Sequence, residues 1–113
     1  MINPGRKVDE VLVFDWDLYL DVSDVSEGYF IYLNQSDSLI FRLIVEGYTV
    51  ELSIKEKKLY EKYDEYHLVV EITPQMGLWT HIFEAPEDGR YVINFDNGIG
   101  KISNLEGNCT LSL

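Results

Sequence analysis

The sequence predicts an all-β fold: an antiparallel two-sheet β-sandwich, such as a jelly roll, with about eight strands. Apolar and polar residues alternate with a period of two along most of the chain, as in half-buried strands. Turn-forming residues recur roughly every 8–12 residues, the spacing of short antiparallel strands. No stretch carries apolar residues at helical spacing over three turns. The 113 residues, of which 46% are apolar, suffice for one domain with one core.

The N-terminal half of the chain predicts four strands. The first has one apolar and one acidic face. Its expected inward residues are Phe14, Trp16, Leu18, Leu20 and Val22. Ser26-Glu27-Gly28 ends this alternation, and the apolar run Tyr29–Leu33 predicts the second strand. A turn at residues 34–37 leads to a third strand over residues 38–45, and a fourth is expected over residues 48–55.

The C-terminal half predicts a loop followed by four more strands. Glu56–Tyr66 is charged and rich in tyrosine, with few apolar residues at helical spacing, so we expect a strand end and an exposed hairpin loop. The strands are expected at residues 67–73, 78–83, 90–95 and 108–113. Pro74 separates the first two of these strands. Ala85–Gly89 and Asp96-Asn97-Gly98 are the later turns.

The apolar register of these strands also predicts the core. The expected core residues are Trp16, Phe41, Leu52, Tyr91, Ile93 and Phe95. The single cysteine, Cys109, cannot form an internal disulfide, and no cluster of Cys and His residues is present for zinc. Cys109 is therefore expected to be a small strand residue.

The charge of the chain disfavours several classes of function. Nine Lys and Arg residues stand against 20 Asp and Glu residues, a formal net charge of −11. Binding to nucleic acid through a basic face, or to an anionic membrane surface, is disfavoured by this sign. The N-terminus has no apolar stretch after Arg6-Lys7, and no window approaches the ~18 apolar residues of a membrane span. We therefore expect a soluble, cytoplasmic protein without direct membrane insertion.

Three stretches of the second half carry a family resemblance. Residues 43–54 contain a strand, a glycine and a second alternating strand, and residues 83–97 contain Gly89-Arg90-Tyr91 followed by Phe95-Asp96-Asn97. Together with the closing strand 108–113, these motifs resemble a GOLD (Golgi dynamics) domain, best over residues 28–113. The paired cysteines of the family's cargo-receptor branch are absent. The resemblance implies a β-sandwich that serves as a protein-interaction module. We expect one domain over residues 1–113, with residues 1–10 flexible.

No group of residues has the spacing of a catalytic site, so we expect no enzyme activity and no cofactor. His67 and His81 have no cysteine near them, and no Gly-x-Ser-x-Gly motif accompanies them. Both are expected to be ordinary strand residues.

Two sets of acidic residues are alternatives for calcium binding. The first set comprises Asp15, Asp17, Asp21 and Asp24. Strand geometry spreads these carboxylates along one face, whereas calcium needs oxygens that converge from a loop. A solvated acidic face, or a charged edge that blocks strand addition, is therefore favoured. The second set is Asp88 with Asp96 and Asn97, although Asp and Asn also form simple turns. No metal site is predicted.

The sequence favours a non-enzymatic protein-binding or adaptor module whose partner is another protein. The candidate partner-binding residues are Leu59, Tyr60, Tyr63 and Tyr66. Tyrosine suits an interface because it offers a large contact area at a small cost in rotamer entropy. Three alternatives stay open: an acidic decoy that mimics the charge of nucleic acid, a carbohydrate-binding β-sandwich, and an assembly subunit.

Overall fold

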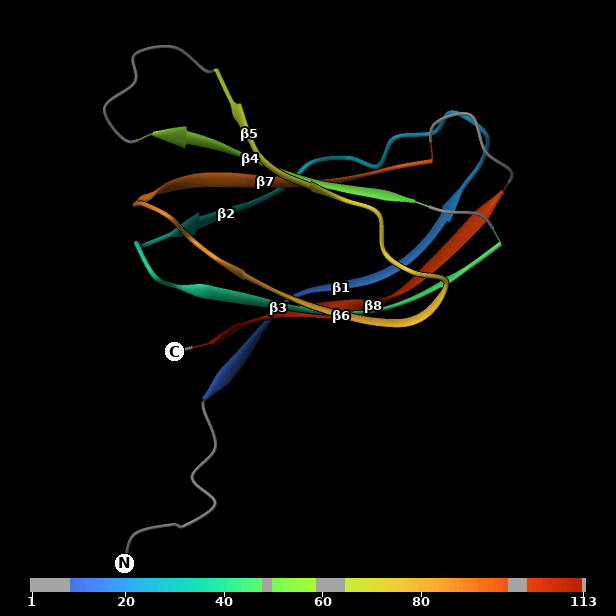
Figure 1. Ribbon diagram of the computed structural model, residues 1–113, viewed down its shortest axis with the longest axis horizontal. Helices are drawn as coiled ribbons and strands as arrows, with labels where there is room; N and C mark the ends of the chain where they lie inside the picture. Colours follow the sequence, from blue (N-terminus) through green and yellow to red (C-terminus); the bar gives the residue numbers. More distant parts are fainter. Residues whose placement is uncertain (1–8, 48–49, 59–64, 98–101, 113) are drawn as a thin grey trace, which may run out of the picture.

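The expected antiparallel β-sandwich is confirmed. The computed structural model describes residues 9–47, 50–58, 65–97 and 102–112, which form eight strands in two facing sheets (Figure 1). The strands are β1 (Glu10–Leu20), β2 (Tyr29–Leu33), β3 (Ser38–Glu46), β4 (Glu51–Lys58), β5 (His67–Ile72), β6 (Gly77–Glu84), β7 (Gly89–Asp96) and β8 (Ser103–Ser112). Among the described residues, no helix has the length and apolar character needed to cross a membrane.

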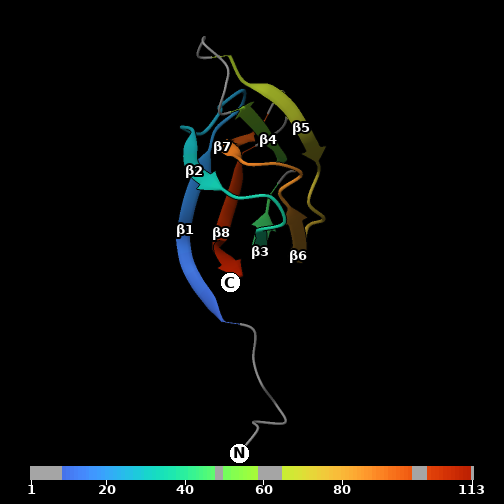
Figure 2. The ribbon, with the colours of Figure 1, turned by 90° about the vertical axis from the view of Figure 1, so that its left-hand side faces the viewer.

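The strands follow a nested order. Sheet A contains β1, β8, β3 and β6, and sheet B contains β2, β7, β4 and β5, each in that spatial order (Figure 2). The first strand therefore pairs with the last, β2 with β7, β3 with β6, and β4 with β5. This is the arrangement of a jelly roll, one of the forms that the sequence predicts. The edge strands are β1 and β6 in sheet A and β2 and β5 in sheet B.

The core is centred on Trp16. Its ring stacks on Phe14 and Phe41 at centroid distances of 5.6 and 6.1 Å and meets Tyr29 and Phe95 edge to face at 5.4 and 4.9 Å. All six expected core residues are buried, as the alternation predicts. Phe14 and Tyr29 are half-buried, and they close the side of the sandwich where β1 faces β2.

Two expectations about the strands need correction. Val22 was expected to face inward, but it lies beyond the end of β1 and is 51% exposed. The strand ends because Asp24 accepts a hydrogen bond from the Asp21 N–H, which closes a tight turn in which Ser23 has a φ of +65°. The last strand begins at Ser103, five residues before the expected start at residue 108. The alternation of apolar residues does not reveal this part of β8, because the residues between Ser103 and Gly107 are mostly polar.

Gly107 is required by the close approach of β3 and β8. Its φ is +144°, in the region that side chains rarely adopt, and a Cβ atom there would overlap the Arg42 carbonyl oxygen. Gly107 pairs with Leu43 on one side and with Trp16 on the other. A side chain at this position would therefore force apart the middle of sheet A.

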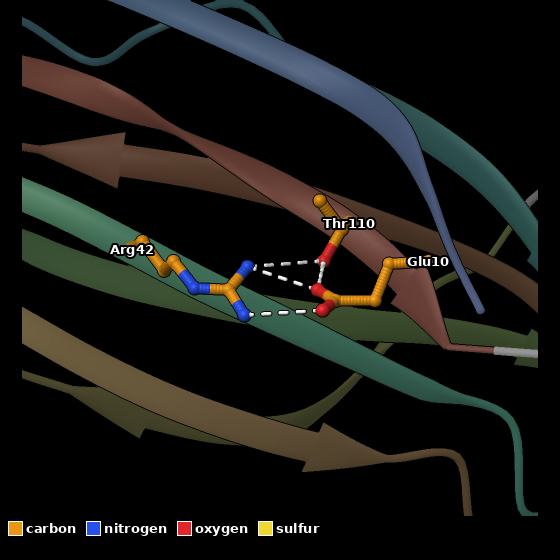
Figure 3. Close-up of polar contacts among 3 residues, drawn as sticks. All are labelled: Glu10, Arg42 and Thr110. Atoms are coloured by element: carbon orange, nitrogen blue, oxygen red, sulfur yellow. Dashed lines mark hydrogen bonds and ion pairs between the residues drawn. The ribbon is translucent and has the colours of Figure 1, made fainter. Parts of the chain in front are cut away.

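A polar cluster on the outer face ties together three strands of sheet A (Figure 3). Arg42 of β3 forms an ion pair with Glu10 of β1 at 2.9 Å, and the Thr110 hydroxyl of β8 donates to the same carboxylate. These hydrogen bonds and the positive charge of Arg42 hold the pKa of Glu10 below its ordinary value.

Candidate functional site

The structure describes only one of the four residues that the sequence nominates for partner binding. Leu59, Tyr60 and Tyr63 lie outside the described residues, so their role stays a prediction. The Tyr66 ring is half-buried and meets the Phe30 ring edge to face at 6.0 Å. Tyr66 adjoins β5 and Phe30 belongs to β2, at opposite edges of sheet B. The ring pair therefore reaches across the outer face of this sheet.

The register of sheet B places a mixed row of side chains on the same face. Phe30 lies opposite Val92, Val92 opposite Lys55, and Lys55 opposite Leu68. Val92 faces outward and yet is only 6% exposed, whereas Phe30 is 57% and Leu68 is 54% exposed. The row thus combines three apolar side chains with Lys55, and its two end residues, Phe30 and Leu68, are open to contact.

A hollow of about 580 Å³ adjoins this row. The acidic residues Glu51, Glu71 and Asp96 line it together with Lys55, and Val25 and Leu68 add apolar surface. These residues come from β4, β5, β7 and the connection between β1 and β2, so only the folded sheet brings them together. Sequence alternation marks Glu51, Ser53 and Lys55 as outward-facing, but only the strand order shows that these residues share one hollow with residues of β5 and β7.

The electrostatics of the hollow favour a positively charged group. Partial burial raises the pKa of Glu51, and the hydrogen bond with Glu71 and the negative charges of Glu71 and Asp96 raise it further. A cationic group in the hollow would favour the ionised form of Glu51. Within the described ranges, no three His, Cys, Asp or Glu residues are arranged to hold a metal ion. The arrangement suits a Lys or Arg side chain of another molecule better than a metal.

Neither set of acidic residues considered for calcium converges. Asp21 and Asp24 build the turn after β1, where Asp21 accepts a hydrogen bond from the Val22 N–H at 2.7 Å and Asp24 accepts one from the Asp21 N–H at 2.8 Å. Asp88 accepts a hydrogen bond from the Gln35 N–H at 2.6 Å. Asp88 and Asp96 flank opposite ends of β7, an extended strand roughly 25 Å long.

Asn97 has a structural role at the end of β7. It is buried, and its side-chain amide donates hydrogen bonds to the carbonyl oxygens of Leu20 at 3.0 Å and Asp21 at 2.8 Å. Its backbone N–H donates to the Asp24 carbonyl at 2.9 Å. Asn97 therefore fixes the connection between β1 and β2 against sheet B.

The histidines and the cysteine lie in strands, as expected. His67 begins β5 in sheet B, whereas His81 lies on β6 in sheet A and stacks on Trp79 at 5.3 Å. Burial lowers the pKa of His81. Cys109 is buried in β8, and burial raises the pKa of its thiol to about 12, which makes the thiol a poor nucleophile.

Comparisons with known proteins identify a fold but no family. No protein-family model and no curated protein matches the chain. One solved structure similar to it is the crystal structure of Aeromonas hydrophila PliG, a periplasmic inhibitor of g-type lysozyme. The match has a TM-score of 0.52 at 10% sequence identity and covers 99% of this chain and 90% of PliG.

This comparison corrects the expected cytoplasmic location. The expectation is contradicted because PliG, a solved structure to which this chain is similar, is a periplasmic protein. The expectation rested on the lack of a leader segment, but a leader is removed on export and leaves no mark on the folded domain. The β-sandwich that the resemblance to a GOLD domain implies is confirmed, whereas the GOLD family itself stays a prediction. At this level of identity, the chain shares with PliG the fold of two antiparallel sheets.

Proposed function

We propose that this chain is a non-enzymatic protein-binding module, formed as one domain, whose working surface is the outer face of sheet B. The observation that carries the proposal is the combination of exposed apolar side chains with the charged hollow on one face. Phe30 and Leu68 offer contact area at the two ends of the mixed row, and Val25 extends it beside the hollow. Interfaces of soluble proteins combine such anchors with a polar rim.

The charge of the chain supports a basic partner. A net charge of −11 steers a positively charged protein toward the surface, and this attraction weakens as salt is added. The carboxylates of Glu51, Glu71 and Asp96 would then receive a Lys or Arg side chain beside the apolar contacts. A module of the GOLD-like type remains the form that the sequence motifs favour.

Site-specific crosslinking tests this proposal. A photoreactive phenylalanine analogue is placed at Phe30 and, as the matched control, at Tyr19, which is 61% exposed on β1 of the other sheet. The partner captured through position 30 is then purified and its affinity measured by calorimetry. We expect Phe30→Ala and Leu68→Ala each to weaken binding about tenfold, which corresponds to about 1.4 kcal/mol. Equal losses from Tyr19→Ala would contradict the proposal.

The fold supplies one specific partner to try first. Because the similar solved structure is an inhibitor of g-type lysozyme, we propose enzyme inhibition as the narrower form of the function. The test adds increasing amounts of the chain to a purified g-type lysozyme and measures cell-wall hydrolysis. Inhibition that is lost in Phe30→Ala would support this form. Full activity at a molar excess of the chain would exclude this enzyme as the partner while leaving the crosslinking test intact.

A further inference from the structure

Three of the four edge strands are protected against the addition of another strand. β1 carries Asp15 and Asp17 and has a bulge between Leu12 and Phe14. β2 is only five residues long. β5 carries Glu71 and is disturbed by a register shift opposite Ile54 and Lys55. Charges, bulges and shortness are the devices by which natural sheets prevent edge-to-edge pairing.

The fourth edge strand, β6, has none of these features. Its eight residues pair with β3 without any register shift, from Gly77 opposite Val45 to Glu84 opposite Ser38. It contains no Lys, Arg or Pro, and its only acidic residue stands at its end. Its outward side chains Leu78 and Ile82 are 77% and 62% exposed. Within the described part of the chain, β6 lies at the side of sheet A with no strand beyond it (Figure 2).

We propose that β6 pairs antiparallel with β6 of a second copy of this chain, about a two-fold axis at Thr80. In this register Thr80 lies opposite Thr80, and Leu78 lies opposite Ile82 of the second copy. Opposed threonines and opposed aliphatic residues are both favourable cross-strand pairs. The outward sequence Leu78, Thr80, Ile82 is therefore complementary to itself when it is reversed.

The neighbouring strand extends this complementarity. Ile44 lies beside Leu78, and Ile40 lies beside Ile82, both on β3. In the joined sheet, each row reads Ile44, Leu78, then Ile82 and Ile40 of the second copy, which makes four aliphatic side chains in line. Two such rows flank the two-fold axis. This continuity argues for a second copy rather than an unrelated strand as the occupant.

Charge opposes this association only at long range. Each copy has a net charge of −11, whereas β6 holds a single carboxylate, that of Glu84. Added salt screens the repulsion between the copies without weakening backbone hydrogen bonds or aliphatic contacts. Self-association should therefore become tighter with salt, the opposite of the salt effect expected for a basic partner on sheet B. Binding of a partner is proposed on sheet B and self-association on sheet A, so an experiment can refute either proposal without affecting the other.

A cysteine scan tests the register. Opposite residues of antiparallel strands have Cα atoms about 4.5–5.5 Å apart, within the range that a disulfide can bridge. Thr80→Cys is expected to give a covalent dimer under mild oxidation. The matched control Leu78→Cys should not, because its counterpart lies four residues away, roughly 13 Å along the strand. Mixing Leu78→Cys with Ile82→Cys should restore the crosslink. The native Cys109 does not interfere because it is buried.

Measurement of mass completes the test. Sedimentation equilibrium of the unmodified chain should show a monomer of 13.1 kDa in equilibrium with a dimer. Thr80→Lys places like charges opposite each other and should weaken the dimer about tenfold or more. Circular dichroism verifies that this exposed substitution leaves the fold intact. A monomer at every protein and salt concentration would overturn the proposal, as would a dimer unaffected by Thr80→Lys or equal crosslinking of Leu78→Cys and Thr80→Cys.

Discussion

Removal of the Trp16 ring should be among the most damaging single changes to this fold. The ring is 4% exposed and contacts four other aromatic rings, Phe14, Tyr29, Phe41 and Phe95. Trp16→Ala would leave a cavity between the two sheets and would end all four ring contacts. Substitutions of this kind cost about 3–5 kcal/mol, a large part of the roughly 5–15 kcal/mol that stabilises a domain.

The structure also separates packing from hydrogen bonding at this position. Trp16 Nε1 is buried and has no hydrogen-bond partner in the described part of the structure, so Trp16→Phe loses packing alone. We expect this milder substitution to cost about 1–3 kcal/mol. Trp79→Ala is the matched control, because Trp79 is half-buried on the edge strand β6 and stacks only on His81 among the aromatic residues of the described chain.

Urea unfolding followed by far-UV circular dichroism measures these costs without relying on tryptophan fluorescence. In a parallel thermal melt, a loss of about 4 kcal/mol in the free energy of unfolding should lower the melting temperature by roughly 10–20 °C for a domain of this size. The expected order of destabilisation is Trp16→Ala first, with Trp16→Phe and Trp79→Ala well below it. If Trp16→Ala cost no more than Trp79→Ala, the assignment of Trp16 to the centre of the core would be wrong.

Three further predictions concern strand contacts and titration. In thermal melts, Gly107→Ala should lower the free energy of unfolding by about 1–3 kcal/mol more than Gly77→Ala does. Both glycines have a positive φ, but of the two only Gly107 faces a backbone oxygen. The lowered pKa of Glu10 stabilises the fold above the carboxyl's unfolded pKa, and this contribution is lost as the pH falls through its folded value. Glu10→Gln should abolish that part of the pH dependence in melts at a series of pH values. The raised pKa of Glu51 means that its ionised form destabilises the fold at neutral pH. Glu51→Gln should therefore increase the melting temperature at neutral pH. A decrease would contradict the repulsion inferred in the hollow.

Alternation in the sequence predicts the sandwich and much of its core, because burial in a strand depends on local register. Trp16, Tyr91 and Phe95 are buried for this reason. The same reasoning fails at Val22, where a tight turn ends the strand before the alternation does. It also fails for the first half of β8, where Leu105 is the only apolar residue between Ser103 and Gly107.

The candidate surfaces depend on strand order, which alternation does not contain. Glu51, Leu68 and Asp96 meet in one hollow because β7, β4 and β5 are neighbours in sheet B. The exposure of β6 as an edge likewise follows from the order of sheet A. Sequence analysis singled out the segment around Tyr66 by composition, and the contact of Tyr66 with Phe30 places that residue on the same face as the hollow.

The nested strand order has a consequence for folding during synthesis. β8 lies between β1 and β3, and β1 pairs with no other strand of the described structure. Sheet A therefore cannot close until the residues of β8 leave the ribosome, roughly 5–20 s after those of β1 at ordinary rates of synthesis. During this interval Phe14, Trp16 and Leu20 have no sheet to bury them. Completion of sheet A must therefore wait for β8, and until then the apolar side chains of β1 are exposed to aggregation.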